Sequence, residues 1–319
     1  MQWLCIREQR SDDLKDFHSP LLVGDFHLER PNLAQVDAGT QGLTYRDWYN
    51  IIKVYNHTNL TKPSDKLPAL SGLASIFSSR LKDEYLAGLW RNDLWSGLTW
   101  YFKPWDEAVK QRIYRAPSWS WAAFDGRINF QVELYGNRTF RRDLEILSSE
   151  VTRKGLDPFG EITFGKLELR STLRIIPAEC IPPDSIGQFS TSICIPNLTT
   201  EVENHPTSDV TIYLDPGHAD KFKNTLYRHS RSVGFLLICS EDVEAPEKSS
   251  SANRSANEMK AMNILREMDG DTWIALIIQE RPSSLGFPQS YIRVGIATAY
   301  RQCRQAFFGN SKRERVILF

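Results

Sequence analysis

The sequence predicts an α+β protein, in which a helical N-terminal segment precedes a mainly antiparallel β domain of sandwich or barrel type. Two patterns carry this prediction. Up to about residue 112 the apolar residues recur every three to four positions, which is the spacing of helices with one buried face. Beyond that point they mostly alternate with polar residues, as in half-buried strands. We therefore divide the 319 residues into an opening segment (1–43), a helical segment (44–112) and a β-rich domain (113–319).

The first helix is expected from Thr44 to His57. Thr44 is a good N-cap, and Asp47 stands three residues later, where it completes a capping box. Four large residues recur on one face of this helix: Trp48, Ile51, Ile52 and Tyr55.

Two further helices are expected before residue 112. An apolar stripe over 70–81 predicts the second, with Ser64 as its N-cap and Pro68 in its first turn. The third is predicted over Tyr85–Trp100 from apolar residues at helical spacing, and Pro104 ends it.

A Trp-rich segment, Tyr114–Gly126, opens the β-rich domain and is predicted to begin a hairpin. Pro117 excludes a helix here, and the alternation that follows places Trp119 and Trp121 on one face. The small residues of the other face, Ser118, Ser120 and Ala122, allow another backbone to approach closely. Asp125 and Gly126 form the turn, and a second strand is expected to follow at Ile128, Phe130, Val132 and Leu134.

More strands are expected toward the C-terminus. Val233–Cys239 and Trp273–Ile278 are continuous apolar runs, which predict strands buried on both faces. The polar segment 241–263 between them predicts a mobile loop. Alternation or a closing apolar run predicts the others, at Leu167, Leu169, Leu173 and Ile175, at Val210, Ile212 and Leu214, at Ile292, Val294 and Ile296, and at Val316–Phe319.

Composition limits the partners. Lys plus Arg equals Asp plus Glu at 39 each, so no overall field attracts nucleic acid or a membrane surface. The longest apolar runs are far too short to span a bilayer. Five scattered cysteines favour reduced thiols, and Met1 is followed by neither a basic nor an apolar leader. We therefore expect a cytoplasmic protein with no membrane or nucleic-acid partner.

The chemistry-bearing motifs are absent from the sequence, including Gly-x-Ser-x-Gly, His-Glu-x-x-His, the Walker A loop and Gly-x-Gly-x-x-Gly. The six histidines are isolated from one another and from any cysteine. The most enzyme-like cluster, Asp215–His218, contains Pro216 and Gly217, and we interpret it as a turn. We therefore expect no enzyme activity and no cofactor, and we assign no catalytic, cofactor-binding or metal-binding residue.

The C-terminal tail is basic and aromatic, a mixture that also occurs in nucleic-acid-binding surfaces. Glu314 interrupts the basic residues, and Gly309-Asn310 suggests a turn between two strands, so we favour a solvated strand edge. The residues concerned are Tyr300, Arg301, Arg304, Phe307, Phe308, Lys312, Arg313 and Arg315.

The Tyr-Arg-Ala-Pro-Ser-Trp-Ser-Trp-Ala sequence within Tyr114–Gly126, followed by Asp-Gly, resembles the hallmark of fungal heterokaryon-incompatibility (HET domain) proteins. In that family it lies in the region after the HET domain itself. The resemblance covers nearly the whole chain from about residue 45. Four other segments are similar to the same family, namely Leu60–Leu73, Ala87–Trp90, Asp157–Gly160 and Tyr291–Gly295.

The start of the chain resembles the very end of a HET domain, at Gln2–Cys5 and Arg7-Glu8, although family members often carry Trp-Glu-Cys where this chain has Leu4. In the family, the HET domain triggers cell death in non-self recognition. The resemblance therefore implies a non-catalytic accessory or regulatory region with a truncated effector. Its protein partner would be a member of its own family or an incompatibility partner.

Two other interpretations stay open. One is an enzyme or accessory protein of a fungal secondary-metabolite gene cluster, which predicts a concave pocket with converging titratable groups. The other is a truncated gene product without activity of its own. That one predicts an exposed apolar surface around Trp3 and the Trp48 helix.

Overall fold

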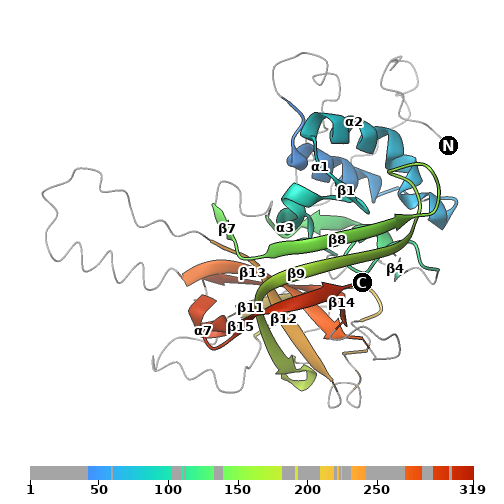
Figure 1. Cartoon of the computed structure of the whole chain (residues 1–319). Helices are drawn as coiled ribbons and strands as arrows, with labels where there is room; N and C mark the ends of the chain where they lie inside the picture. The colour runs from blue at the N-terminus through green and yellow to red at the C-terminus, as the bar shows by residue number, and fades with distance from the viewer. Residues whose placement is uncertain are drawn as a thin grey trace, which may run out of the picture.

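A computed structural model shows an α+β fold with a few helices and a large, mainly antiparallel sheet, as the sequence predicts. Helices α1 and α2 lie at one end of the molecule and strands β11–β15 at the other, and the long β8–β9 hairpin runs between them (Figure 1). The structure describes residues 42–58, 60–102, 109–110, 113–132, 139–181, 191–192, 209–218, 221–222, 224, 231–241, 270–281, 290–301 and 304–319. Residues 1–41 of the opening segment and 242–263 of the predicted loop lie outside these.

Helix α1, Tyr45–Tyr55, confirms the first predicted helix and its cap. The Asp47 amide donates to Thr44 Oγ1 at 3.3 Å, and the Thr44 amide donates to Asp47 Oδ2 at 2.8 Å. Trp48 and Ile52 are fully buried. The exposed apolar surface predicted around Trp48 is therefore not found there, because the chain itself covers this side chain. Trp3 lies outside the described residues.

Helix α2, Ser71–Leu81, confirms the second predicted helix, but Ser64 does not cap it. Two 3-10 turns come first, η2 at Pro63–Lys66 and η3 at Pro68–Leu70, and Ser64 lies within η2. A proline at the first position starts each turn, and Pro68 has no amide with which to continue η2 as a regular helix.

The third predicted helix, Tyr85–Trp100, is wrong. The chain instead forms a tight hairpin of β1 (Tyr85–Leu86) and β2 (Leu89–Trp90). Both turn residues have positive φ, 49° at Ala87 and 98° at Gly88, as a two-residue hairpin turn requires. The apolar residues of this segment are buried on every side, so their spacing does not indicate a helix with one buried face. Three short elements follow: η4 (Arg91–Asp93), α3 (Leu94–Gly97) and β3 (Trp100–Phe102).

The hairpin predicted from Tyr114 is also wrong, although both tryptophans are fully buried as expected. The Ser120 amide donates a hydrogen bond to Pro117 O and closes a turn, and Ser120 Oγ then caps the 3-10 turn η5. The short strands that follow pair with other partners, β5 with β4 and β6 with β3. Their bounds are β4 Val109–Lys110, η5 Trp121–Ala123, β5 Phe124–Asp125 and β6 Ile128–Phe130.

The large sheet has the order β10-β11-β14-β13-β12-β9-β15, with β7 on β12 and β8 on β9. A further, parallel pairing joins β14 to β15, so β9, β12, β13, β14 and β15 close into a ring. The closing contact is short, since β15 meets β14 only at Ile317 and Leu318. The bounds are β7 Phe140–Arg142, β8 Glu145–Arg153, β9 Ile162–Pro177, β10 Thr191–Ser192, β11 Asp209–Leu214, β12 Ser232–Glu241, β13 Gly270–Glu280, β14 Ser290–Arg301 and β15 Lys312–Leu318, with η7 Ala178–Cys180 and α7 Arg304–Phe308.

The predicted strands are found with two corrections. Ile175 is exposed, because Ile176 takes the buried position at that end of β9. The basic residues Lys312, Arg313 and Arg315 are exposed and pair with β9 alone, as in the predicted solvated edge, because β15 meets β14 only at Ile317 and Leu318. Helix α7, rather than a strand, precedes its turn. On β15, Arg315 Nε is 2.6 Å from Glu168 of β9.

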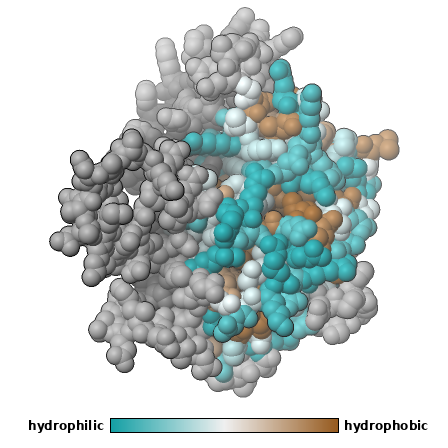
Figure 2. All heavy atoms as spheres, turned by 60° about the vertical axis from the view of Figure 1, so that its left-hand side comes forward, coloured by the Kyte–Doolittle hydropathy of each residue, from teal (hydrophilic) through white to brown (hydrophobic). Residues whose placement is uncertain are grey.

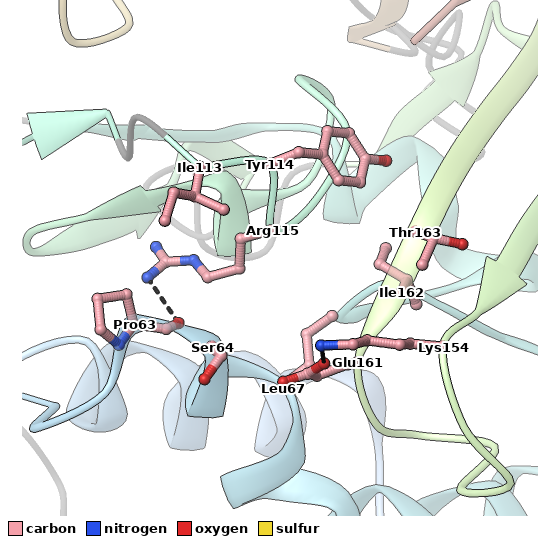
Figure 3. Close-up of a pocket in the computed structure, with 10 residues that line it drawn as sticks. All are labelled: Pro63, Ser64, Leu67, Ile113, Tyr114, Arg115, Lys154, Glu161, Ile162 and Thr163. Atoms are coloured by element: carbon pink, nitrogen blue, oxygen red, sulfur yellow. Dashed lines mark hydrogen bonds and ion pairs between the residues drawn. The ribbon is translucent and has the colours of Figure 1, made fainter.

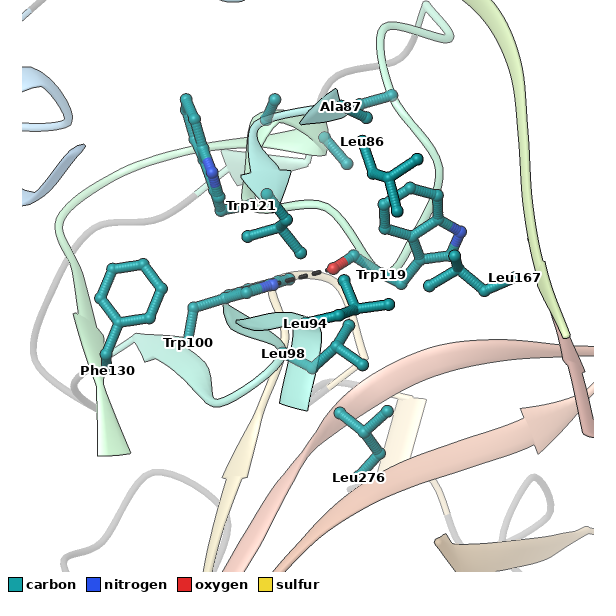
Figure 4. Close-up of a cluster of buried hydrophobic side chains, with 14 of the residues drawn as sticks. Leu86, Ala87, Leu94, Leu98, Trp100, Trp119, Trp121, Phe130, Leu167 and Leu276 are labelled. Atoms are coloured by element: carbon teal, nitrogen blue, oxygen red, sulfur yellow. Dashed lines mark hydrogen bonds between the residues drawn. The ribbon is translucent and has the colours of Figure 1, made fainter. Parts of the chain in front are cut away.

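One core cluster joins the helices to the sheet (Figure 4). It includes Trp48 of α1, Trp119 and Trp121 of the Trp-rich segment, and Leu276 of β13. The Trp100 indole donates to Trp119 O at 2.9 Å at its centre. The core therefore continues across the predicted boundary near residue 112, and the domain limits stay a prediction.

Candidate functional site

A pocket of about 420 Å³ lies where three segments distant in sequence meet. One wall is η2, another is the start of the Trp-rich segment, and the third is the end of the β8–β9 hairpin (Figure 3). Its volume falls in the range of small-ligand pockets. The lining residues are Pro63, Ser64, Leu67, Ile113, Tyr114, Arg115, Lys154, Glu161, Ile162 and Thr163.

Arg115 holds two of these walls together. Its Nη1 donates to Pro63 O of η2 at 3.1 Å, as Figure 3 shows. Its Nε donates to Ala122 O at 2.6 Å, and its Nη2 donates to Phe124 O at 2.8 Å and to Asp125 Oδ1 at 2.9 Å. A planar guanidinium suits several simultaneous acceptors, so the pocket wall is held rigidly.

Lys66 is a second cation behind this wall. Its Nζ lies 3.3 Å from Asp125 Oδ1, and 5.4 Å and 5.8 Å from the ring centres of Tyr55 and Trp121. Only 2% of the side chain is exposed. Burial lowers the pKa of Lys66 to about 8, and the Arg115 charge adds to this while Asp125 opposes it.

Asp125 is the shared anion of the two cations. Burial alone would raise the pKa of Asp125, but the hydrogen bonds and charges of Arg115 and Lys66 outweigh it and leave this pKa below its ordinary value. The two cations therefore share one anion within the protein.

The third wall is closed by the hairpin end. Lys154 Nζ lies 2.5 Å from Glu161 Oε2, and the Lys154 amide donates to Glu161 O at 2.8 Å. Thr163 Oγ1 donates to Thr152 O at 3.3 Å. Every charged side chain among the described lining residues thus already has an opposite charge beside it.

The rim carries apolar groups in water. Ile113 is 83% exposed and Tyr114 51% exposed. Elsewhere the described surface is mainly hydrophilic with small separate apolar patches, in the view of Figure 2. The arrangement offers apolar contact, the hydroxyls of Ser64 and Thr163, and paired charges. This is the chemistry of a binding site.

The Asp215–His218 cluster is a turn, as predicted, and the His218 amide donates to Asp215 O at 3.1 Å. The Asp215 carboxylate is buried and lies 3.0 Å from Arg293 Nε. Arg293 Nη1 donates to Leu98 O at 2.8 Å, and Nη2 donates to Trp100 O. The carboxylate therefore anchors β3 to β14.

No site residue was assigned from the sequence, and the pocket was not predicted from it. Arg115 stands in the motif that carries the family resemblance, but its role depends on acceptors as distant in sequence as Pro63. In the part of the chain that the structure describes, no group of three or more His, Cys, Asp or Glu residues is placed to hold a metal ion. Cys180 and Cys239 are thiols; the other three cysteines lie outside the described residues.

Among the described helices, the longest of which have 11 residues, none is long and apolar enough to cross a membrane. Comparisons with known proteins found no matching family model, no similar curated protein and no matching solved structure.

Proposed function

We propose that this chain is a non-catalytic, partner-binding region of a HET-type fungal non-self recognition protein and that it acts in the cytoplasm. Its partner would be a protein, either a family member or an incompatibility partner. The observation that carries the proposal is the pocket beside Arg115 with Ile113 exposed at its rim. Tyr114 and Arg115 in this lining belong to the Trp-rich segment that carries the family resemblance.

The contacts of that segment support a structural role for its motif. Ser120 Oγ donates to Ala87 O at 2.6 Å, and the Trp121 indole donates to Gly88 O at 3.1 Å. The Ser118 amide donates to Phe319 O at 3.1 Å. The small residues thus let other backbones approach, and Tyr114 and Arg115 of the motif line the pocket.

A second candidate, a small-molecule enzyme or accessory protein, is favoured by the concave pocket itself. Titratable groups do line it, namely Arg115, Lys154 and Glu161. However, each of these three described side chains is engaged with an opposite charge inside the protein. We therefore prefer binding to catalysis.

Expression in a filamentous fungus tests the proposal. We expect no cell death from this chain alone, and a changed frequency of death when it is co-expressed with a full-length HET-type protein. Ile113→Asp should remove that effect, whereas Ile175→Asp, the same change at another exposed isoleucine on β9 outside the pocket, should keep it. Death caused by the chain alone would overturn the assignment.

A further inference from the structure

We propose that η2, the pocket wall formed by Pro63–Lys66, is a proton-linked gate that opens more readily when Lys66 is protonated. The structure shows the closed position, in which η2 lies against Arg115 of the Trp-rich segment (Figure 3). The inference rests on the proposed function only in treating this pocket as the binding site. It adds a way in which access to the pocket is regulated.

A lysine, rather than an apolar side chain, fixes this part of the chain in place. Lys66 is the one buried residue in the described segment 60–66, and only 2% of its side chain is exposed. Apolar anchoring begins with Leu67, which is 1% exposed. A segment with few buried apolar contacts is the kind that opens locally while the rest of the protein stays folded.

Polar contacts hold η2 closed. Arg115 Nη1 donates to Pro63 O at 3.1 Å, and the Tyr55 hydroxyl donates to Lys66 O at 2.9 Å. Lys66 Nζ donates to Asp125 Oδ1 at 3.3 Å. Water replaces most of the free energy of the two hydrogen bonds to carbonyl oxygens once η2 is exposed, so they do not lock the segment. The balance between closed and open therefore depends on the Lys66 side chain.

The surroundings of Lys66 oppose its charged form. Asp125 is shared with Arg115, which donates to both of its oxygens and to three backbone carbonyls. An ammonium group has three N–H donors, yet among the described residues Lys66 donates to Asp125 alone. The ring centres of Tyr55 and Trp121 lie 5.4 Å and 5.8 Å away. Moving the ammonium into water therefore restores hydrogen bonds that the closed position denies it.

Opening is linked to the proton because it returns Lys66 to water. Burial lowers the pKa of Lys66 to about 8 in the closed position, whereas the ordinary value is 10.5. Between these values the closed gate has lost the proton and the open gate holds it, so opening becomes less favourable as the pH rises.

The groups that face Lys66 do not titrate in this window. Arginine side chains such as Arg115 keep their charge. The pKa of Asp125 lies below its ordinary value because of Arg115 and Lys66. Burial raises the pKa of Tyr55 well above its ordinary value, so this hydroxyl stays neutral. Lys66 is therefore the group whose proton controls the gate.

Hydrogen exchange of the full chain, measured by mass spectrometry on peptides that cover residues 61–67, reports the opening. Lys66→Met keeps a long buried side chain without its charge, and at pH 7 it should slow exchange of the η2 amides by about tenfold or more. Lys62→Met, at the exposed lysine nearby, is the matched control and should leave exchange unchanged. Faster exchange in Lys66→Met would show that the lysine only fastens η2, and it would overturn the inference.

Rapid-mixing exchange at pH 8 and pH 10 tests the linkage without a variant. After correction for the intrinsic exchange rate, protection of the η2 amides should rise by about tenfold or more in the parent and stay constant in Lys66→Met. Exchange in η2 should depend little on urea, unlike that in α1, because a local opening exposes little surface. Equal protection at the two pH values in the parent, or exchange of η2 only together with α1, would contradict the gate.

These measurements need no ligand and are independent of the cell-death assay. A gate that fails while the chain still changes the frequency of death in cells would overturn the inference alone. An intact gate without that effect in cells would overturn the proposed function alone.

Discussion

The guanidinium carbon of Arg293 on β14 lies 3.3 Å from the ring centre of Trp100 on β3, and both side chains are fully buried. Asp215 neutralises the arginine, which donates to two carbonyl oxygens of the Leu98–Trp100 segment. A cation stacked on an aromatic ring and paired with a carboxylate, all out of water, connects the sheet to the segment before the Trp-rich motif. This connection gives the first of four predictions.

Arg293→Met should lower the free energy of unfolding by about 3–5 kcal/mol, because Asp215 is left buried and unpaired. The double variant Arg293→Met, Asp215→Asn should recover much of that loss. Arg313→Met, whose partner Glu145 lies at an exposed site 3.7 Å away, is the matched control and should cost less than about 1 kcal/mol. Urea unfolding measures all three; equal losses in the Arg293 and Arg313 variants would contradict the buried-pair interpretation.

Lys66 should make the protein more stable as the pH rises from 8 toward 10. Its pKa is about 8 when folded, against an ordinary 10.5, so in this window the unfolded chain holds the proton and the folded chain has lost it. Stability then rises with pH, by about 3 kcal/mol if the whole shift is realised. In Lys66→Met, the unfolding free energy plotted against pH should lack this rise between pH 8 and 10. Identical slopes in the two proteins would show that Lys66 titrates normally.

Asp93 should act in the opposite direction in acid. Burial raises its pKa from 3.8 to about 6, although the Tyr49 hydroxyl, which donates to Asp93 Oδ2 at 2.6 Å, partly offsets this. Between pH 4 and 6 the folded chain therefore keeps a proton that the unfolded chain has lost, and stability falls by about 3 kcal/mol as the pH rises. Asp93→Asn mimics the protonated form and should flatten this slope in pH-dependent denaturation, whereas a slope like that of the parent would refute the assignment.

Gly88 should tolerate no side chain. Its φ of 98° suits glycine, and a Cβ there would lie 2.7 Å from Trp121 Nε1. Gly88→Ala should cost more than about 2 kcal/mol, since the backbone is strained and the buried indole must move. Gly72→Ala in the first turn of α2 meets nothing within 4 Å and should be neutral or slightly stabilising. Thermal unfolding of both variants checks the contrast, and a tolerated Gly88→Ala would mean that the β1–β2 turn can rearrange.

Elements whose evidence is local could be predicted from the sequence. The capping box of Thr44 and Asp47 marks the start of α1 because both partners lie within one turn. The apolar runs of β12 and β13 mark central strands because strands buried on both faces need no alternation. In both cases the decisive contacts are near neighbours or simple burial.

Elements that depend on tertiary contacts could not be predicted from the sequence. Tyr85–Trp100 carries helical spacing, yet it forms the β1–β2 hairpin and three short elements, because a segment buried on every side gives no information about one face. The Trp-rich segment alternates like a strand, yet its turn at Pro117 and the Ser120 cap shape it instead. The competing hydrogen bonds are invisible in the spacing of apolar residues.

The sequence by itself determined the α+β class, the first two helices and the buried central strands, because these follow from the periodicity and burial of neighbouring residues. Only the tertiary structure decided the ring of five strands, the Arg293–Asp215 anchor and the pocket. The pocket's walls come from residues 63–67, 113–115 and 154–163, and Arg115 becomes a pocket wall only because its acceptors are brought to it from η2, η5 and β5. Contacts between residues so far apart depend on how the whole chain packs, which no local pattern records.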